Sequence, residues 1–335
     1  MISTLQDSSA GAAIGIDVGG TKVAVGVVTR AGHLLASHRL EVAAAPSFAS
    51  LLDEAAARAR ELRKVLDKER VVGVGVGMPE LVDPTGEVRT SSVIPWSRRD
   101  LVRAFGALGP VVVQADVRAA ALAEARFGAG RSWSSFVYVT VGTGISCSFV
   151  QNGQPYAGAH GAAQLLGSGR LALRCPHCDL QSTSVALEDC AGGPALLDRF
   201  RKRTGSRLRG VEEVFAQAAA GNLVAAEVLG ESADAIGSFV AFLVGLLDPF
   251  GVIIGGGLGL AGGWYWDRLV SSAREHIWAE YVRSIPIKRA GLGTNAGVIG
   301  AGYEAIISRQ RTTEPAHGPS VRGEEGTESK EVRAC

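Results

Sequence analysis

The sequence predicts an α/β protein of two related lobes with a ligand cleft between them. Three observations support this prediction: a length of 335 residues, a set of short β-branched runs that end in glycine, and a strand–turn pattern that occurs twice. A chain of this length favours two lobes over one small module. Glycine turns at strand ends expose backbone where a ligand can approach.

Each half of the chain opens with three short strands separated by two turns. In the first half, strands near 14–16, 23–28 and 34–40 are separated by the turn DVGGTK and by a turn at 30–32. In the second half, strands at 136–141 and 145–151 flank GTG, and Asn152-Gly153 leads to a strand near Tyr156. Asn-Gly between strands is a strong hairpin signal. The similarity predicts that the lobes are structural repeats.

The remaining elements follow from hydrophobic spacing. Further strands are predicted at 71–76, 111–113 and 251–254, and helices at 48–69, 116–127, 187–203, 211–220, 223–247, 264–282 and 296–308. We expect a first lobe over 12–118, completed by a returning helix at 294–310, and a second lobe over 119–293. The polar, Gly/Pro-containing residues 311–335 predict a disordered tail.

Composition excludes several classes of partner. The net charge is +1, with 34 Lys+Arg against 33 Asp+Glu and no basic stripe, so we expect no nucleic-acid partner. The longest nearly apolar run, 235–247, is 13 residues and too short to span a bilayer, so no membrane partner is expected. The chain start lacks a secretory signal, and five cysteines, an odd number, indicate the cytoplasm. The 44 glycines make up about 13% of the chain, nearly twice the average of roughly 7%. Glycine is therefore the informative feature of the composition.

The segment DVGGTK is the first candidate ligand-binding loop. A strand delivers Asp17 to a turn in which Gly19 and Gly20 expose backbone N–H groups, followed by Thr21 and Lys22. Such a turn can approach phosphate oxygens closely, and Asp17 would hold a Mg²⁺-bound water. A tight hairpin turn without a ligand explains these residues equally well, and the spacing is not that of a Walker A loop.

The second candidate loop lies at the matching point of the repeat. Gly142, Thr143 and Gly144 follow an apolar strand and offer another backbone cradle and a hydroxyl. The pairing with DVGGTK suggests two loops that grip phosphates from opposite sides of a cleft.

A third glycine loop follows the strand at 251–254. Gly257, Gly259 and Gly262 form a literal GxGxxG, so a dinucleotide-binding domain is one interpretation. The motif lies too late in the chain for a full domain of that kind. In the competing interpretation, the glycines let an adenine lie flat on the backbone.

Asp116 is the candidate general base. It follows the apolar run 111–113 and opens an Ala-rich helix, where the helix N-terminus is expected to keep the carboxylate ionised at neutral pH. In a kinase it would accept the proton of the attacking hydroxyl. A simple N-cap is the alternative role.

Cys175-Pro176-His177-Cys178 has zinc-knuckle spacing, and Cys190 lies twelve residues beyond. One CxxC without a second pair leaves two interpretations open, a structural Zn²⁺ site and a set of metal-free thiols.

Taken in order, six segments resemble the ROK family (repressor, open reading frame, kinase) over about residues 12–308: IGIDVGGTKVAVGVV, VGVGVGMPELVDPTGEV, QADVRAAALAE, VTVGTGI, ALEDCAGGPAL and FGVIIGGGL. The resemblance implies an actin-like (ribonuclease H-like), hexokinase-like fold in which two α/β lobes hold ATP and a sugar in the cleft. Enzymes of this family use ATP and Mg²⁺ to phosphorylate hexoses, often at the 6-hydroxyl. Family members are often homodimers, which the apolar helix at 235–247 would permit.

The resemblance also implies residue roles. Asp116 takes the place of the catalytic base, Glu188 that of a glutamate that binds sugar hydroxyls, and Glu80 lies on the sugar side. The first phosphate loop would comprise Asp17, Gly19, Gly20, Thr21 and Lys22, and the second would comprise Gly142, Thr143 and Gly144. The loop on the adenosine side would comprise Gly255, Gly256 and Gly257. Cys175 and Cys178 would be the remnant of a zinc site.

The departures from the family pattern are concentrated on the sugar side. Ala115 replaces the asparagine before the catalytic aspartate, and Pro79-Glu80 replaces Pro-Gly. The family's Gly-Glu-x-Gly-His aligns with residues 164–168, QLLGS, so both the glutamate and the histidine are missing, and Ala186 replaces a third cysteine.

Losing polar partners changes the acceptor that a buried pocket prefers, because unpaired polar groups are costly. We therefore expect an acceptor with fewer or rearranged hydroxyls than glucose: an amino or deoxy sugar, or a C7-cyclitol, presenting a primary hydroxyl to Asp116. An ordinary glucokinase is the alternative within this class.

Two hypotheses of another class are weaker. A ROK-type transcriptional regulator would carry an N-terminal winged helix-turn-helix, and only about 12 residues precede the first strand. A catalytically silent sensor is disfavoured by the retained Asp116 and phosphate loops.

Overall fold

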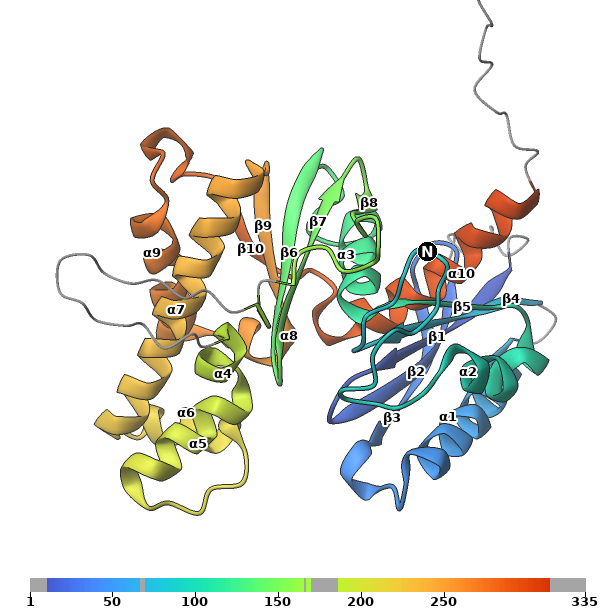
Figure 1. The fold of residues 1–335 in the computed structure, drawn as a ribbon, viewed down its shortest axis with the longest axis horizontal. Helices are drawn as coiled ribbons and strands as arrows, with labels where there is room; N and C mark the ends of the chain where they lie inside the picture. The colour runs from blue at the N-terminus through green and yellow to red at the C-terminus, as the bar shows by residue number, and fades with distance from the viewer. Residues whose placement is uncertain (1–10, 67–69, 166, 170–185, 314–335) are drawn as a thin grey trace, which may run out of the picture.

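The computed structural model describes residues 11–66, 70–165, 167–169 and 186–313. Within them the chain forms two five-stranded sheets, each covered by helices, side by side in Figure 1. The first sheet has the order β3-β2-β1-β4-β5, comprising β1 (Ala12–Val18), β2 (Lys22–Thr29), β3 (Leu34–Glu41), β4 (Val71–Met78) and β5 (Val111–Ala115). The second has the order β10-β9-β6-β7-β8, comprising β6 (Ser135–Val141), β7 (Ile145–Gln151), β8 (Gln154–Pro155), β9 (Gly251–Gly255) and β10 (Ile287–Arg289).

The two sheets have the same topology. In each, the first strand pairs antiparallel with the second, which pairs antiparallel with the third. On its other side the first strand pairs parallel with the fourth, and the fourth with the fifth. The expected two-lobed α/β fold and its internal repeat are thus confirmed.

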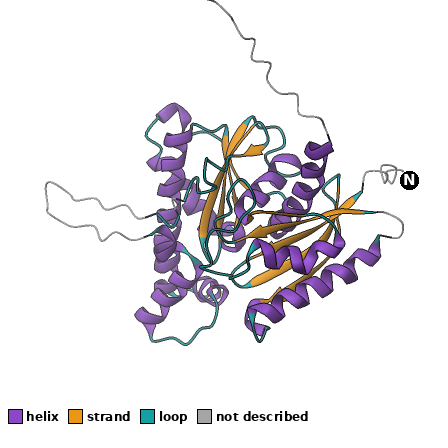
Figure 2. Ribbon diagram, turned by 45° about the vertical axis from the view of Figure 1, so that its right-hand side comes forward, coloured by secondary structure: helices purple, strands orange, loops and turns teal. Residues whose placement is uncertain are grey.

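Helices cover both faces of the first sheet (Figure 2). On one face, α1 (Phe48–Leu62) and α2 (Arg98–Phe105) bury Leu51, Leu101 and other apolar side chains against the strands. On the other lies α10 (Ala296–Thr313), which approaches so closely that a Cβ on Gly75 would lie 1.7 Å from the Ala301 carbonyl oxygen. Glycine is therefore required where α10 crosses β4.

The second sheet packs against the longest helix, α7 (Leu223–Leu247), and against α9 (Gly263–His276). Among the described residues α7 is the one helix long and apolar enough to cross a bilayer, but 61% of its most apolar stretch is buried within the protein. It is the core helix of this lobe. The shorter helices α4 (Leu187–Ala191), α5 (Gly193–Thr204) and α6 (Val211–Ala219) complete this layer.

Two helices join the halves. Helix α3 (Asp116–Arg126) follows the last strand of the first sheet yet packs beside β7 and β8, whereas α10 follows the second sheet and packs on the first. They contact each other between the sheets (Figure 1), where a Cβ on Gly300 would lie 1.7 Å from the Ala119 carbonyl oxygen.

Several expected boundaries were wrong. The helix predicted at 187–203 is broken at Gly192, because Pro194 starts a new helix and cannot continue the old one. The helix predicted at 264–282 ends at His276, and that predicted at 48–69 ends at Leu62. Helix α10 runs to Thr313, so residues 311–313 of the expected tail are helical; the rest of the tail lies outside the described residues.

Candidate active site

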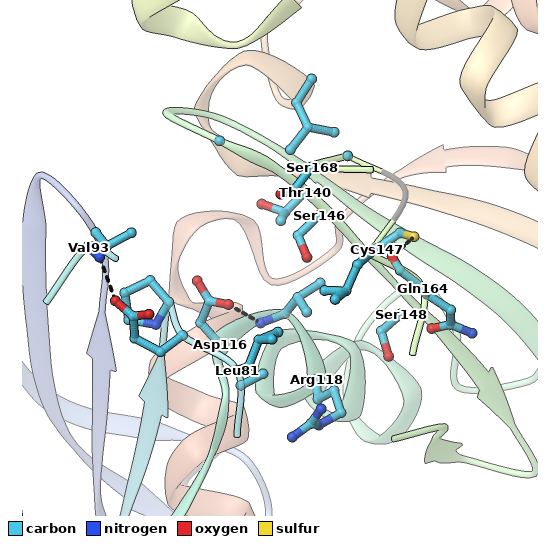
Figure 3. A pocket seen from close by; sticks show the side chains of 18 of the residues that line it. Leu81, Val93, Asp116, Arg118, Thr140, Ser146, Cys147, Ser148, Gln164 and Ser168 are labelled. Carbon is cyan, nitrogen blue, oxygen red and sulfur yellow. Dashed lines mark hydrogen bonds between the residues drawn. The ribbon is translucent and has the colours of Figure 1, made fainter. Parts of the chain in front are cut away.

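A cavity of about 570 Å³ lies at the ends of the central strands, and both halves of the chain line it. Gly19, Gly20, Glu80 and Asp116 come from the first lobe and the helix after it. The second lobe contributes β6, β7, the loop around Gln164, and the predicted residues Gly142, Thr143, Gly144 and Glu188. Figure 3 shows part of this wall around Asp116. The volume falls in the range of small-molecule sites.

The three glycine loops lie next to one another. A Cβ added to Gly20 would lie 3.9 Å from Thr143 Cγ2, so the first and second loops face each other across the cavity. A Cβ added to Gly142 would lie 3.8 Å from the Gly257 nitrogen, which puts the third loop beside the second. The structure thus brings together three segments separated by more than a hundred residues each.

The third loop depends on glycine geometry. Gly255 ends β9, and Gly256 opens the short helix α8 (Gly256–Gly259) with φ +81°, where a Cβ would meet the Val141 carbonyl. A Cβ on Gly257 would meet nothing within 4 Å, so this backbone faces open space. The dinucleotide-domain interpretation of the GxGxxG is wrong, because β9 belongs to a mixed sheet in which β6 pairs antiparallel with β7.

Asp116 is the first residue of α3 and lines the cavity. The N-cap is Ala115 rather than Asp116, although Asp116 Oδ1 accepts a 2.6 Å hydrogen bond from the Val117 N–H. Burial and the nearby Asp17 charge raise the pKa of Asp116 to about 7. The expectation that the helix N-terminus keeps it fully ionised was therefore wrong, because desolvation outweighs the helix dipole. A pKa near neutrality suits a general base.

Asp17 is the second perturbed carboxylate. Burial raises the pKa of Asp17 to about 6, and the charge of Arg39 opposes this. Asp17, the second-last residue of β1, lies against the start of α10, where a Cβ on Gly297 would lie 2.3 Å from Asp17 Oδ2. Arg39 is held by hydrogen bonds to Thr294 and Asn295 just before that helix.

Glu80 lines the cavity, but its carboxylate is engaged by the protein. It accepts hydrogen bonds of 2.5–3.0 Å from the Thr90 hydroxyl and from the backbone N–H groups of Ser92, Val93 and Ile94. Burial would raise its pKa, but these hydrogen bonds together hold the pKa below its usual value. Glu80 therefore orders the loop at 90–94, which forms one wall beside Gly20.

Glu188 stands beside the second glycine loop. Its Oε2 accepts from the Ile145 N–H at 3.5 Å, and a Cβ on Gly144 would lie 3.1 Å from the same oxygen. The Gly193 N–H, at the start of α5, donates to the Gly142 carbonyl at 2.8 Å and supports the loop from behind.

The remaining predicted residues lie elsewhere. The cavity is not lined by Asp17, Thr21, Lys22, Gly255, Gly256 or Gly257, and Lys22 Nζ pairs instead with Glu41 at 3.6 Å on the surface. Cys175 and Cys178 lie outside the described residues, as does Leu166. Among the residues that are described, no group of three or more His, Cys, Asp or Glu side chains could hold a metal ion.

The residues fit a phosphate-rich nucleotide with a hard cation. Three adjacent glycine loops give phosphates and a base close access to backbone, and Asp17 offers an oxygen ligand. Mg²⁺ is usually held by one or two carboxylates together with phosphates and water, so a closed protein cage is not required.

Several cavity residues were not found from the sequence. Arg118 of α3 donates to the Val82 and Gly161 carbonyls at 2.7 and 3.1 Å and so links segments of both lobes. Ser146 and Ser148 of β7 also line the cavity. The available signal was the start of ISCSFVQ, where two serines, at 146 and 148, alternate with apolar residues.

Comparison with known proteins agrees with this architecture. The ROK family model matches residues 13–307. A glucokinase of Streptomyces coelicolor is 29% identical over 311 residues, which cover 87% of this chain and 96% of that protein. An N-acetylmannosamine kinase of Yersinia pestis is 27% identical, covering 89% and 99%. The crystal structure of a ROK family glucokinase from Streptomyces griseus with glucose and AMPPNP superposes with a TM-score of 0.75 at 27% identity, covering 87% of this chain and 98% of that one. The chain belongs to the ROK family.

Proposed function

We propose that this protein is an ATP-dependent carbohydrate kinase that phosphorylates a primary hydroxyl of a hexose or hexose-like acceptor. The observation that carries the proposal is the meeting of glycine loops from both halves with Asp116 in one cavity. The kinase names of the relatives support the same reaction class.

In this proposal each residue has a distinct task. Bound ATP and Mg²⁺ supply the phosphoryl group and neutralise its charge. Asp116 accepts the proton of the acceptor hydroxyl, a role for which its raised pKa suits it. Asp17 orients water on the cation, and the loops at Gly19 and Gly142 hold phosphates with backbone N–H groups. Approach of the two lobes excludes water from the cavity they share.

The acceptor we favour is an amino sugar, a deoxy sugar or a C7-cyclitol. Ala115, Leu165 and Ser168 are among the positions where this chain departs from the family pattern, and all three line the cavity. Leu165 and Ala115 offer no hydrogen bonds to an acceptor, so a hydroxyl placed against them would be left unpaired. A cytoplasmic site of action, where ATP is available, completes the proposal.

The test is ADP release measured over a panel of hexoses, amino sugars and C7-cyclitols. Asp116→Asn should lower kcat by about 100-fold or more, as expected for loss of a general base, while ATP binding measured by calorimetry is retained. Asp53→Asn, on the exposed face of α1, is the matched control and should leave kcat unchanged. An unchanged rate in Asp116→Asn would overturn the assignment. Glucose as the best acceptor by a wide margin would refute our interpretation of Leu165 and Ser168.

Metal analysis of the same preparation decides whether the CxxC segment binds zinc.

We also propose a homodimer. Phe242 and Leu246, four residues apart on α7, are 49% and 59% exposed, and Phe250 just beyond is 52% exposed. Apolar side chains gathered on one helix face are typical of an interface. Light scattering should give a dimer mass, and Leu246→Asp should give a monomer. Leu35→Asp on β3, which is similarly exposed, should leave the mass unchanged; a monomeric wild-type protein contradicts the proposal.

A further inference from the structure

One wall of the cavity carries two hydroxyls on a single strand. Ser146 and Ser148 are two residues apart on β7, so their side chains share a face and are separated by roughly 6.6 Å along the strand. Both line the cavity, and in Figure 3 they lie between Asp116 and Gln164.

Ser148 is unusual because its hydroxyl is unpaired. The residue is 1% exposed, and its Oγ has no hydrogen-bond partner among the described residues. Buried hydroxyls normally find a partner, because an unsatisfied one is destabilising. A ligand that supplies a hydroxyl would remove this cost.

Hydrogen bonds hold the wall around Ser148 in place. Gln164 has φ +65°, a conformation that non-glycine residues adopt rarely, and its side-chain oxygen accepts from the Phe149 N–H at 2.7 Å. Its backbone carbonyl accepts from Cys147 Sγ. These contacts fix the segment at 164 against β7, next to Ser148.

The chemistry of this wall suits a partner that bears hydroxyls. A serine hydroxyl both donates and accepts, which matches an alcohol. Among the cavity-lining residues that the structure describes, the one cation is Arg118, whose guanidinium donates to the Val82 and Gly161 carbonyls and so braces the wall.

We propose that Ser146 and Ser148 form a subsite that recognises two ring hydroxyls of a polyol acceptor, distinct from the hydroxyl that reacts at Asp116. This inference rests on the proposed kinase function and deepens it. It assigns to β7 part of the polar recognition that the segment at 164–168 lacks.

The experiment pairs serine variants with acceptor analogues that each lack one hydroxyl. The best acceptor among glucose, N-acetylmannosamine and a hydroxymethyl cyclitol is compared with its monodeoxy derivatives, using wild type, Ser146→Ala and Ser148→Ala. Ser37→Ala, on the exposed β3, is the matched control. Removing the recognised hydroxyl should lower kcat/KM about fivefold or more in wild type and Ser37→Ala. The same removal should cost little further in the serine variant that had paired with it.

Unliganded Ser148→Ala should keep or raise the Tm, because it removes an unpaired buried hydroxyl. A large fall in Tm would make the hydroxyl structural and overturn the subsite. Equal deoxy penalties in wild type and both serine variants would overturn it as well, while turnover by wild type would still uphold the kinase. If wild type turns over no acceptor, the kinase proposal fails. The subsite is then tested by calorimetric binding of the same polyols and deoxy derivatives to wild type and the serine variants. Binding that does not differ between these proteins would refute the subsite.

Discussion

At the scale of single residues, two carboxylates, one in the cavity and one in the first glycine loop beside it, are hard to ionise in this fold. Asp17 and Asp116 both have raised pKa values, about 6 and about 7, and burial is the main cause for each. A carboxyl whose folded pKa exceeds its unfolded value near 3.8 favours the folded state at low pH. That contribution is lost as the pH rises from about 4 to the folded pKa. These two carboxylates therefore destabilise the folded protein at neutral pH.

This predicts that removing the Asp116 charge stabilises the protein. Asp116→Asn should raise the Tm by a few degrees at pH 8, and the gain should shrink toward pH 4, since each unit of pKa shift corresponds to about 1.4 kcal/mol. Thermal unfolding of wild type and variant between pH 4 and 8 measures this difference. A gain that does not change with pH would point to altered packing instead of ionisation.

Arg118 predicts a change in the pH dependence of the reaction. Its charge lowers the pKa of Asp116. Arg118→Gln should therefore move the acidic limb of the kcat/KM profile from about pH 7 to higher pH, by about one pH unit, which is the smallest shift typical of a neighbouring opposite charge. Arg118→Lys keeps the charge but loses the paired contacts to Val82 and Gly161. The acidic limb should therefore stay in place in Arg118→Lys; a shift of equal size in both variants would contradict the electrostatic explanation.

At the scale of elements, the sequence predicted those whose signal is local. β-branched runs ending in glycine located the central strands. The repeated strand–turn pattern predicted two related lobes, and the structure shows them as two sheets with the same strand order. The strand β10 was missed because it has only three residues, Ile287–Arg289, and two of them, Lys288 and Arg289, are charged and exposed. The helix α2 was missed although Ser97 and Asp100 form a capping box at its start.

The candidate site shows the same division between local and long-range signals. The glycine loops could be predicted because their backbone geometry is encoded in adjacent residues. The hydrogen bonds of the Glu80 carboxylate could not be predicted, because their donors lie 10–14 residues further along the chain in a loop without regular structure. The proximity of Asp17 to Gly297 could not either, since it depends on how α10 returns to the first sheet.

The close packing of α10 on β4 predicts that a methyl group on Gly75 is destabilising, whereas one on an exposed helical glycine is not. Gly75→Ala would drive a methyl group into the Ala301 carbonyl and should destabilise the protein by about 2 kcal/mol or more. Gly106→Ala, at an exposed residue after α2 with helical φ −59°, where a Cβ would make an ordinary 3.8 Å contact with Val102, should stabilise by about 0.5–1 kcal/mol. Urea unfolding compares them. Similar effects of the two variants would mean that α10 does not press on the sheet as closely as described.

At the scale of the whole molecule, each lobe is completed by a helix that follows the other lobe's sheet. Helices α3 and α10 exchange sides and pack against each other, so neither sheet is covered independently of the other half. Glu124 of α3 fixes this crossing. It is fully buried and accepts hydrogen bonds of 2.8–3.0 Å from the N–H groups of Ala129, Gly291 and Leu292, the last two just before α10.

Loss of Glu124 should therefore weaken both lobes together. Glu124→Ala leaves three backbone N–H groups without their acceptor and should lower the free energy of unfolding by about 3 kcal/mol or more, since each unsatisfied buried group costs about 1–3 kcal/mol. Glu124→Gln keeps one side-chain oxygen and should lose less. Glu227→Ala removes a carboxylate that is 68% exposed and 3.8 Å from Arg203, and should change stability by about 0.5 kcal/mol or less. Urea unfolding followed by tryptophan fluorescence and by circular dichroism measures all three variants, and we expect one transition by both probes. A loss in Glu124→Ala no larger than in Glu227→Ala would show that the crossing of α3 and α10 is held by apolar packing alone.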